Sequence, residues 1–312
     1  MKYLIIGGSG FIGQILCKKI KNNFFILDKR RPFYYKNKYK KCDVNNISSL
    51  KKNIGKKSII INLAAEHRDD TYPVSKFYET NYKAAKKICA IAESKDVKKI
   101  IFFSSVAVYK KSVGPLNEDS QTGFVNDYGY SKLLAEKVYI DWQKKKPNLN
   151  QLIIIRPTVV YGPGNYNNII RLIKVIKNRF IIFPGNGKNI KSTAYVENLV
   201  NFTLHVMRNN KKKLKIYNYA DKSLLTMNEF IKCCIKQYGY KFFIFINLNS
   251  FVVKISLFIL NKLSFLNKKI SILVQRIEKV SSNSIIESKE KIELKNIVTT
   301  RFALKKIIND KH

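Results

Sequence analysis

The chain has 312 residues and a mass of 36.2 kDa, which is about twice the size of one ordinary domain. Its composition, 46% hydrophobic and 26% charged, is that of a globular protein with a sizeable core and excludes a disordered or fibrous chain. The 59 basic residues outnumber 21 acidic ones and give a net charge of +38, which attracts polyanions, anionic membranes and acidic small molecules.

The cysteines and histidines indicate neither a metal site nor a disulfide framework. The five cysteines have no C-x-x-C spacing, and the three histidines, His67, His205 and His312, are far apart. Met1 leads directly into an apolar strand rather than into a signal peptide, so we expect a cytoplasmic protein. Asn and Lys interrupt the apolar stretch 242–266 before the roughly 20 residues that a membrane span requires.

The first 160 residues alternate short β-branched runs with longer amphipathic stretches. This alternation predicts an α/β fold, a Rossmann-type doubly wound parallel sheet with helices on both faces. The predicted strands are Tyr3–Ile6, Phe24–Leu27, Ser58–Leu63, Ile100–Ser104 and Leu152–Ile155.

The alternation breaks beyond Pro163. A turn-rich segment follows at 183–187, then a helix beginning near Val196, the apolar stretch, and a polar tail from Lys279. We therefore predict a Rossmann domain over residues 1–162 and a smaller C-terminal α/β substrate region over residues 163–312, with some elements crossing back to the first.

A glycine-rich loop follows the first predicted strand and opens a helix over Gln14–Ile20. Gly7, Gly10 and Gly13 are spaced as G-x-x-G-x-x-G. Gly7 allows a tight turn, Gly10 lets the backbone approach a pyrophosphate, and Gly13 lets helix and sheet pack closely. In this context the loop predicts dinucleotide binding.

Asp28 ends the second predicted strand, where a carboxylate accepts hydrogen bonds from both adenosine ribose hydroxyls and repels a 2′-phosphate. We therefore expect NAD rather than NADP, although Lys29, Arg30 and Arg31 follow directly. Asp43 and the adjacent Val44 would lie beside the adenine, with Asp43 accepting from its amino group. The alternative for Asp43 is a carboxylate that caps a turn.

Tyr128 and Lys132 are four residues apart and so share one face of a predicted helix. A phenol is a poor base at neutral pH unless a nearby cation stabilises its phenolate, which Lys132 could do while holding the nicotinamide ribose. Ser105 follows the strand Ile100–Ser104, at the sheet edge where α/β sites form, and could relay a proton from a substrate hydroxyl. The alternative is an unremarkable pair on a solvated helix.

Several motifs together resemble the extended short-chain dehydrogenase/reductase family, in its branch of nucleotide-sugar epimerases and dehydratases. They appear in the family's order and intervals over almost the whole chain. These motifs are Gly7–Gly13, Asn62-Leu63-Ala64-Ala65, Asn81, Ser104–Tyr109, Tyr128-x-x-x-Lys132 with Ala135-Glu136, and Arg156–Pro163.

The resemblance implies the roles of individual residues. It makes Ser105, Tyr128 and Lys132 the catalytic set, and it implies substrate contacts for Ser105, Val106, Lys191 and Arg276. The cofactor-binding residues that it implies are Gly7, Gly10, Phe11, Ile12, Gly13, Asp28, Lys29, Asp43, Val44, Leu63, Ala64, Ala65, Asn81, Tyr128 and Lys132. No residue is assigned to a metal.

The residues after Ser105 indicate which reaction of this branch to expect. Its 4,6-dehydratases carry an acidic pair there, whereas this chain has Val106 and Ala107, and Ala107 also lacks the carboxylate of related decarboxylases. Neither side chain can transfer a proton. What remains is 4-epimerisation through a transient 4-keto sugar, which requires only Ser, Tyr, Lys and NAD.

The substrate is less strongly determined. Val159 replaces the usual Asn, and Lys191 replaces the usual diphosphate Arg, of soluble UDP-sugar epimerases. The runs 63–70, 104–109, 191–196 and 217–222 resemble a narrower group, the epimerases of O-antigen gene clusters that act on N-acetylglucosamine diphospho-undecaprenol. A soluble UDP-glucose or UDP-N-acetylglucosamine 4-epimerase, and a non-catalytic NAD-binding Rossmann protein, are the alternatives.

A lipid-linked substrate requires the enzyme to work at the anionic inner face of the plasma membrane. Read as one helix, residues 250–268 carry a polar stripe and a broad apolar face, which indicates either an interfacial helix or a buried helix of the smaller domain. We expect no nucleic-acid partner, because no basic stripe alternates with stacking aromatics. A homodimer remains open.

Overall fold

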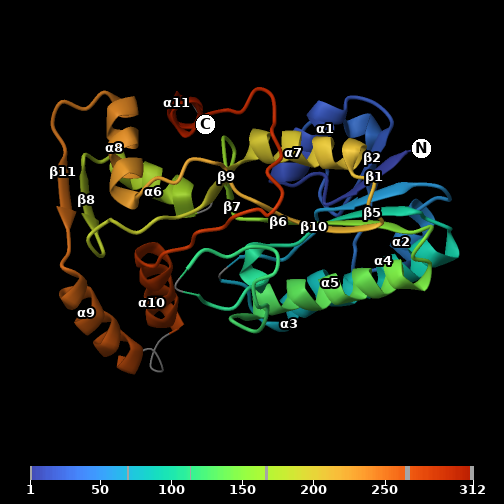
Figure 1. Ribbon diagram of the computed structural model, residues 1–312, viewed down its shortest axis with the longest axis horizontal. Coiled ribbons are helices and arrows are strands. Elements are labelled where there is room, and N and C mark those ends of the chain that lie inside the picture. The colour runs from blue at the N-terminus through green and yellow to red at the C-terminus, as the bar shows by residue number, and fades with distance from the viewer. Residues whose placement is uncertain (1, 69, 113, 166–167, 264–267, 310–312) are drawn as a thin grey trace.

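The computed structural model describes residues 2–68, 70–112, 114–165, 168–263 and 268–309. A seven-stranded parallel sheet in the order β10-β6-β5-β4-β1-β2-β3 forms its centre (Figure 1). The strands are β1 (Tyr3–Ile6), β2 (Phe24–Asp28), β3 (Tyr39–Lys41), β4 (Ile59–Asn62), β5 (Lys99–Phe103), β6 (Gln151–Pro157) and β10 (Leu214–Tyr219). The predicted Rossmann-type fold is confirmed, and the five predicted strands end within two residues of the observed bounds, whereas β3 and β10 were not predicted.

Helices cover both faces of this sheet, as a parallel sheet requires. One face packs against α1 (Phe11–Ile20) and α7 (Val196–Asn209), and the other against α2 (Ile47–Asn53), α4 (Ala84–Ser94) and α5 (Asp127–Lys145) (Figure 1). A short helix α3 (Ser75–Phe77) and a π-helical segment η2 (Tyr78–Lys83) precede α4, and short 3-10 turns η1 (Lys36–Lys38) and η3 (Val106–Val108) lie in loops.

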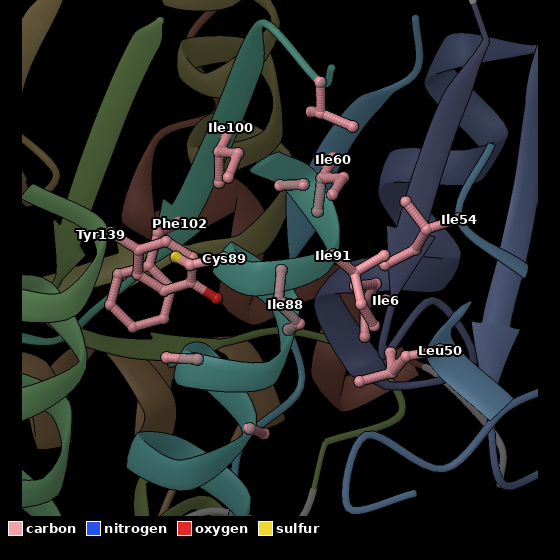
Figure 2. Close-up of a cluster of buried hydrophobic side chains, with 14 of the residues drawn as sticks. Ile6, Leu50, Ile54, Ile60, Ile88, Cys89, Ile91, Ile100, Phe102 and Tyr139 are labelled. Carbon is pink, nitrogen blue, oxygen red and sulfur yellow. The ribbon is translucent and has the colours of Figure 1, made fainter. Parts of the chain in front are cut away.

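Strands β1, β2, β4, β5 and β6 are largely buried because most of their side chains are apolar. Figure 2 shows the layer between the sheet and α4, where Ile60 and Ile100 of neighbouring strands meet Ile88. Phe102 lies against Tyr139 with ring centroids 4.5 Å apart, and the Tyr139 hydroxyl accepts a 2.8 Å hydrogen bond from the Asn62 amide. This layer fixes β4, β5 and α5 relative to one another.

Two segments after residue 162 belong to the central sheet layers. Strand β10 pairs with β6, and α7 covers the same face as α1. The remaining elements except α9 pack around a second core: α6 (Asn168–Ile176), β8 (Phe180–Phe183), α8 (Met227–Tyr238), β11 (Ile244–Asn247), α10 (Lys268–Ser281) and α11 (Thr300–Asn309). Helix α9 (Ser250–Leu263) contacts α10. Strands β7 (Val159–Tyr161) and β9 (Thr193–Tyr195) form a small pair, and β8 pairs with β11.

The stretch predicted as one helix from 250 to 268 is two helices, so that prediction is wrong. Helix α9 ends at Leu263 and Lys268 begins α10, while Ser264 lies outside the described residues. The alternative of a buried helix is also wrong, because Phe251, Ile255, Phe258 and Ile259 are exposed. Among the described residues, no helix has the length and apolar character to cross a membrane.

Candidate active site

The glycine loop joins β1 to α1 at the carboxyl edge of the sheet. A Cβ on Gly7, which has φ +78°, would lie 2.6 Å from the Ala64 nitrogen, and one on Gly13 would lie 2.6 Å from the Gly8 Cα. At Gly10 the nearest atom would be the Gly7 oxygen, at 3.1 Å. Gly10 is also the N-cap of α1 and offers no side-chain cap. The loop therefore leaves a helix N-terminus with close backbone access, which fits a pyrophosphate.

Asp28 ends β2 beside this loop and is 8% exposed. Its two carboxylate oxygens accept hydrogen bonds from the backbone nitrogens of Ser9, at 3.0 Å, and Arg30, at 2.9 Å. The Ser9 hydroxyl in turn donates to the Arg30 carbonyl at 2.7 Å. The carboxylate is thus held next to the glycine loop, which fits the predicted ribose contact.

Replacing Asp28 with Asn should weaken NAD binding at least tenfold, because the amide is a weaker acceptor for ribose hydroxyls and donates where the carboxylate only accepts. The measurement is the NAD content of the purified protein together with titration of the stripped protein. Glu93→Gln, which removes an exposed carboxylate on α4, is the matched control. Unchanged NAD affinity in Asp28→Asn would contradict the ribose contact.

Asp43 is exposed and caps a turn, since its carboxylate accepts a 2.8 Å hydrogen bond from the Asn45 nitrogen. Val44 is buried in the core next to α2 and α4. The turn-capping alternative is therefore present in the structure. The contact of Asp43 and Val44 with the adenine stays a prediction.

Asn81 is buried in η2 and binds the loop that follows β4. Its Oδ1 accepts from the Glu66 nitrogen and its Nδ2 donates to the Glu66 oxygen, each at 3.0 Å, and Nδ2 also lies 2.9 Å from the Ser131 hydroxyl on α5. These bonds fix the segment containing Leu63, Ala64 and Ala65 against α5. In this structure Asn81 positions the predicted cofactor-lining loop.

Ser105 directly follows β5 and caps η3, where its hydroxyl accepts a 3.1 Å hydrogen bond from the Ala107 nitrogen. Two buried hydroxyls lie at the same sheet edge, Ser104 after β5 and Thr158 after β6. Within the described residues neither has a hydrogen-bond partner. Unpaired buried hydroxyls are costly, so this edge fits a polar ligand.

Tyr128 occupies the first turn of α5, and its ring lies against Phe77 with centroids 6.2 Å apart. The Asn126 side chain caps the helix by accepting from the Gly129 nitrogen at 2.8 Å. Burial raises the pKa of the Tyr128 phenol, and the Ser105 hydroxyl acts in the opposite direction. The structure thus brings the predicted serine and tyrosine into contact.

Lys132 lies one turn further along α5 and is 1% exposed. Its ammonium donates to the Phe103 carbonyl and lies 4.3 Å from the centroid of the Phe102 ring. Burial lowers the pKa of Lys132 to about 7, and the charge of Glu136 opposes this. The spacing of four residues places Lys132 on the same helix as Tyr128, but here its ammonium is held by β5. Stabilisation of the phenolate stays a prediction.

The lowered pKa of Lys132 predicts a pH-dependent contribution to stability. Between pH 7 and 10.4 unfolded Lys132 holds a proton that folded Lys132 has lost, so this group raises the free energy of unfolding as pH increases, by up to about 1.4 kcal/mol per pH unit. Urea unfolding of NAD-free wild type and Lys132→Met at pH 7.5 and 8.5 measures the difference. We expect the wild type to gain about 1 kcal/mol relative to the variant. Parallel pH profiles would contradict the lowered pKa.

Sequence reasoning missed a buried network behind α5. Arg156 donates from Nε to Glu136 at 2.8 Å and from a terminal nitrogen to the same carboxylate at 2.5 Å, and it also donates to the Tyr109 hydroxyl at 2.8 Å. Tyr109 donates to the Asn218 side chain on β10 at 2.7 Å. The network joins α5, β6 and β10, and the Glu136–Arg156 pair stands within the family motifs noted above.

Gly129 is a second feature that the sequence did not reveal. A Cβ at this position would lie 2.0 Å from the Ala107 oxygen. The glycine therefore allows the first turn of α5 to contact η3, which brings Tyr128 to Ser105. In the sequence, only its position next to Tyr128 could have drawn attention to Gly129, because its contact partner Ala107 lies far away in the chain.

The predicted substrate residues come from three parts of the chain. Val106 lies partly exposed in η3, next to Ser105. The Lys191 ammonium donates to the Ser282 hydroxyl at 3.1 Å, and Lys191 forms a β-bridge with Ser284. Arg276 is exposed on α10. Their contacts with substrate stay predictions.

This fold and site define a Rossmann enzyme with a Ser-Tyr-Lys set. The sequence matches the NAD dependent epimerase/dehydratase family over residues 3–220, and the chain belongs to this family.

Individual relatives are sugar epimerases. The chain is 38% identical over 230 residues to N-acetyl-alpha-D-glucosaminyl-diphospho-ditrans,octacis-undecaprenol 4-epimerase of Escherichia coli O157:H7, covering 73% of this chain and 70% of that one. It is 26% identical over 231 residues to UDP-glucose 4-epimerase of Vibrio cholerae, covering 70% of each. The crystal structure of UDP-N-acetylglucosamine 4-epimerase from Bacillus cereus has the same fold, with a TM-score of 0.76 at 18% identity over 98% of this chain and 95% of that chain.

These likenesses confirm the predicted family, the cofactor NAD, and the class of enzyme, an NAD-dependent sugar epimerase. The alternative of a non-catalytic Rossmann protein is thereby set aside. The names of these two relatives specify sugar-diphosphate substrates, one lipid-linked and one UDP-linked, in line with the expected class of substrate.

Proposed function

We propose that this protein is a 4-epimerase of N-acetylglucosamine diphospho-undecaprenol in the synthesis of O-antigen or another surface polysaccharide. The observation that carries the reaction type is the contact of Ser105 with Tyr128 next to two side chains, Val106 and Ala107, that cannot transfer protons. The 38% identity with the E. coli enzyme of that name supports the substrate.

The chain supplies binding and proton transfer. The glycine loop would hold the pyrophosphate of NAD, Asp28 its adenosine ribose, and Lys132 its nicotinamide ribose. Bound NAD supplies reversible acceptance of a hydride from C4 of the sugar. Tyr128 takes the proton of the 4-hydroxyl, with Ser105 orienting that hydroxyl, and returns it after the 4-keto sugar has turned its other face to the cofactor. Lys132 favours the phenolate once its ammonium turns from the Phe103 carbonyl.

The substrate-binding part is assigned to residues 163–312. Lys191 and Arg276 would supply cations for the sugar diphosphate, and Val106 would contact the sugar. The role of Lys191 is supported by its position, because its contacts with Ser282 and Ser284 join two segments that are distant in the sequence. A lipid-linked substrate further places the protein at the inner face of the plasma membrane, where the charge of +38 favours anionic lipid.

A direct comparison of two substrates tests the assignment. Purified protein is incubated with N-acetylglucosamine diphospho-undecaprenol in detergent and, separately, with UDP-N-acetylglucosamine, and the N-acetylgalactosamine product is quantified. We expect kcat/KM for the lipid-linked sugar to exceed that for the UDP-sugar at least tenfold, and Tyr128→Phe to be inactive on both. A preference for the UDP-sugar would replace the proposal with the soluble UDP-sugar epimerase.

A further inference from the structure

The ribbon formed by β8 and β11 carries an apolar outer face. In the parallel register Ile244 pairs with Phe180 and Ile246 with Ile182, and all four side chains are exposed. The alternate residues of β8, including Phe183, point into the core that α6 and α8 share. A two-stranded ribbon that faces water on one side ordinarily carries polar residues there. This one does not.

Helix α9 continues the exposed apolar surface. Two residues separate it from the end of β11, and both elements lie at the same end of the molecule, opposite α2 (Figure 1). Phe251 is 68% exposed and Phe258 61% exposed, and Ile255 and Ile259 are exposed as well. The spacing of these residues places them on one side of the helix. Exposed apolar surface of this extent marks an interaction site.

We call this surface the apolar face. Its members are Phe180, Ile182, Ile244, Ile246, Phe251, Ile255, Phe258 and Ile259.

The charges around the apolar face select its partner. All of its members come from two stretches, residues 142–196 and 230–277, that contain no acidic residue at all. The second stretch contains eight basic residues, and five exposed cations lie within three residues of members of the face in the sequence: Lys177, Arg179, Lys241, Lys254 and Lys262. Apolar side chains framed by cations match an anionic bilayer, in which the apolar groups enter the acyl boundary and the cations meet phosphate.

The same charges disfavour a second copy of the chain. An isologous contact would place this cationic surface against the same cationic surface of the second copy, with no carboxylate from these stretches to pair with the cations. We propose that the apolar face docks the enzyme on the surface of an anionic membrane. This inference deepens the proposed function, on which it rests for the presence of a lipid-linked substrate.

Binding to vesicles tests the docking face without any substrate. The holoenzyme is cosedimented with vesicles of phosphatidylethanolamine and phosphatidylglycerol, and with vesicles of phosphatidylcholine alone. We expect the partition coefficient on anionic vesicles to fall about tenfold or more in each of two pairs, Ile182→Ser with Ile246→Ser and Phe251→Ser with Phe258→Ser. The control pair is Ile47→Ser with Leu149→Ser, which removes similarly exposed side chains elsewhere and should change binding less than twofold.

A charge variant separates the two contributions. Lys241→Glu with Lys254→Glu should weaken binding to anionic vesicles at low salt and have little further effect in 1 M salt, because only charge attraction is screened. The apolar pairs should lose binding at both salt concentrations. Retained NAD and an unchanged melting temperature show that each variant is folded.

Two results would overturn the docking face. The first is wild-type protein that does not bind anionic vesicles, and the second is serine variants of the apolar pairs that bind these vesicles as strongly as the wild type does. Wild-type dimers that dissociate in the apolar pairs, with no vesicle binding by either, would assign the face to a second copy. These readouts contain no sugar. A preference for UDP-sugar in the substrate assay would therefore refute the proposed substrate, whereas the vesicle assay would still test the docking face independently.

Discussion

Tyr128→Phe is expected to lower epimerase turnover at least about 1000-fold while leaving the NAD content unchanged. The substitution removes the oxygen that accepts and returns the 4-hydroxyl proton in the proposed mechanism, and general acid–base groups contribute about 100- to 10,000-fold to rates. The ring itself remains, so its packing against Phe77 and the first turn of α5 are preserved. The measurement is a direct product assay, with NAD quantified after denaturation.

Tyr130→Phe is the matched control for this substitution. It removes a phenol oxygen from the same turn of α5, from a ring that packs against Phe124 at 5.4 Å between centroids. We expect near-normal turnover. If Tyr128→Phe epimerised at a rate close to wild type, the proton would have to travel through another group, and the mechanism derived for Ser105 and Tyr128 would be wrong.

Gly129→Ala is expected to lower turnover about 100-fold or more, although alanine favours a helix by about 1 kcal/mol over glycine. The added Cβ would lie 2.0 Å from the Ala107 oxygen and 2.8 Å from the Ala107 carbonyl carbon. Both are backbone atoms, which cannot rotate away. Helix α5 and η3 must therefore separate, and with them Tyr128 and Ser105.

The readouts distinguish mispositioning from loss of fold. In Gly129→Ala we expect kcat to fall with NAD still bound, since the glycine loop lies elsewhere in the sheet edge. Gly114→Ala is the control, because a Cβ there has no neighbour within 4 Å among the described residues. Wild-type kcat in Gly129→Ala would show that the contact between α5 and η3 does not set the Ser105–Tyr128 geometry. An unfolded variant is recognised by its lost NAD.

Most of the parallel sheet was predictable because its strands are encoded by the local sequence pattern. Strands such as β1 and β4 are continuous apolar runs, and each is followed by turn residues or by an amphipathic helix, so periodicity alone places them. The same holds for the glycine loop. A side chain at Gly7 would clash with the backbone of Ala64, in the loop after the neighbouring strand β4, and one at Gly13 would clash with the backbone of Gly8. Glycines at these positions are typical of dinucleotide-binding loops.

Other features depend on contacts between distant segments. Nothing in the local sequence shows that the Gly129 backbone touches Ala107, that Asn81 holds Glu66, or that Lys132 donates to Phe103. The division of residues 250–268 into α9 and α10 was also missed, because the apolar periodicity runs through the break. Such contacts depend on how the side chains of all segments pack together, and a local stretch of sequence does not show this.

By itself the sequence determined five strands of the Rossmann-type sheet, the glycine loop, the preference for NAD and the shared helix of Tyr128 and Lys132, because short-range periodicity and motif spacing encode all of them. The approach of Tyr128 to Ser105 depends on the contact between Gly129 and Ala107, which the tertiary structure alone shows. Only the tertiary structure decided which way α9 and the β8–β11 ribbon turn their apolar side chains. A helix with a broad apolar side looks the same in sequence whether it faces a core or the solvent. The choice rests on which neighbours remain to cover it, and for Phe251 and Phe258 none of the described elements does.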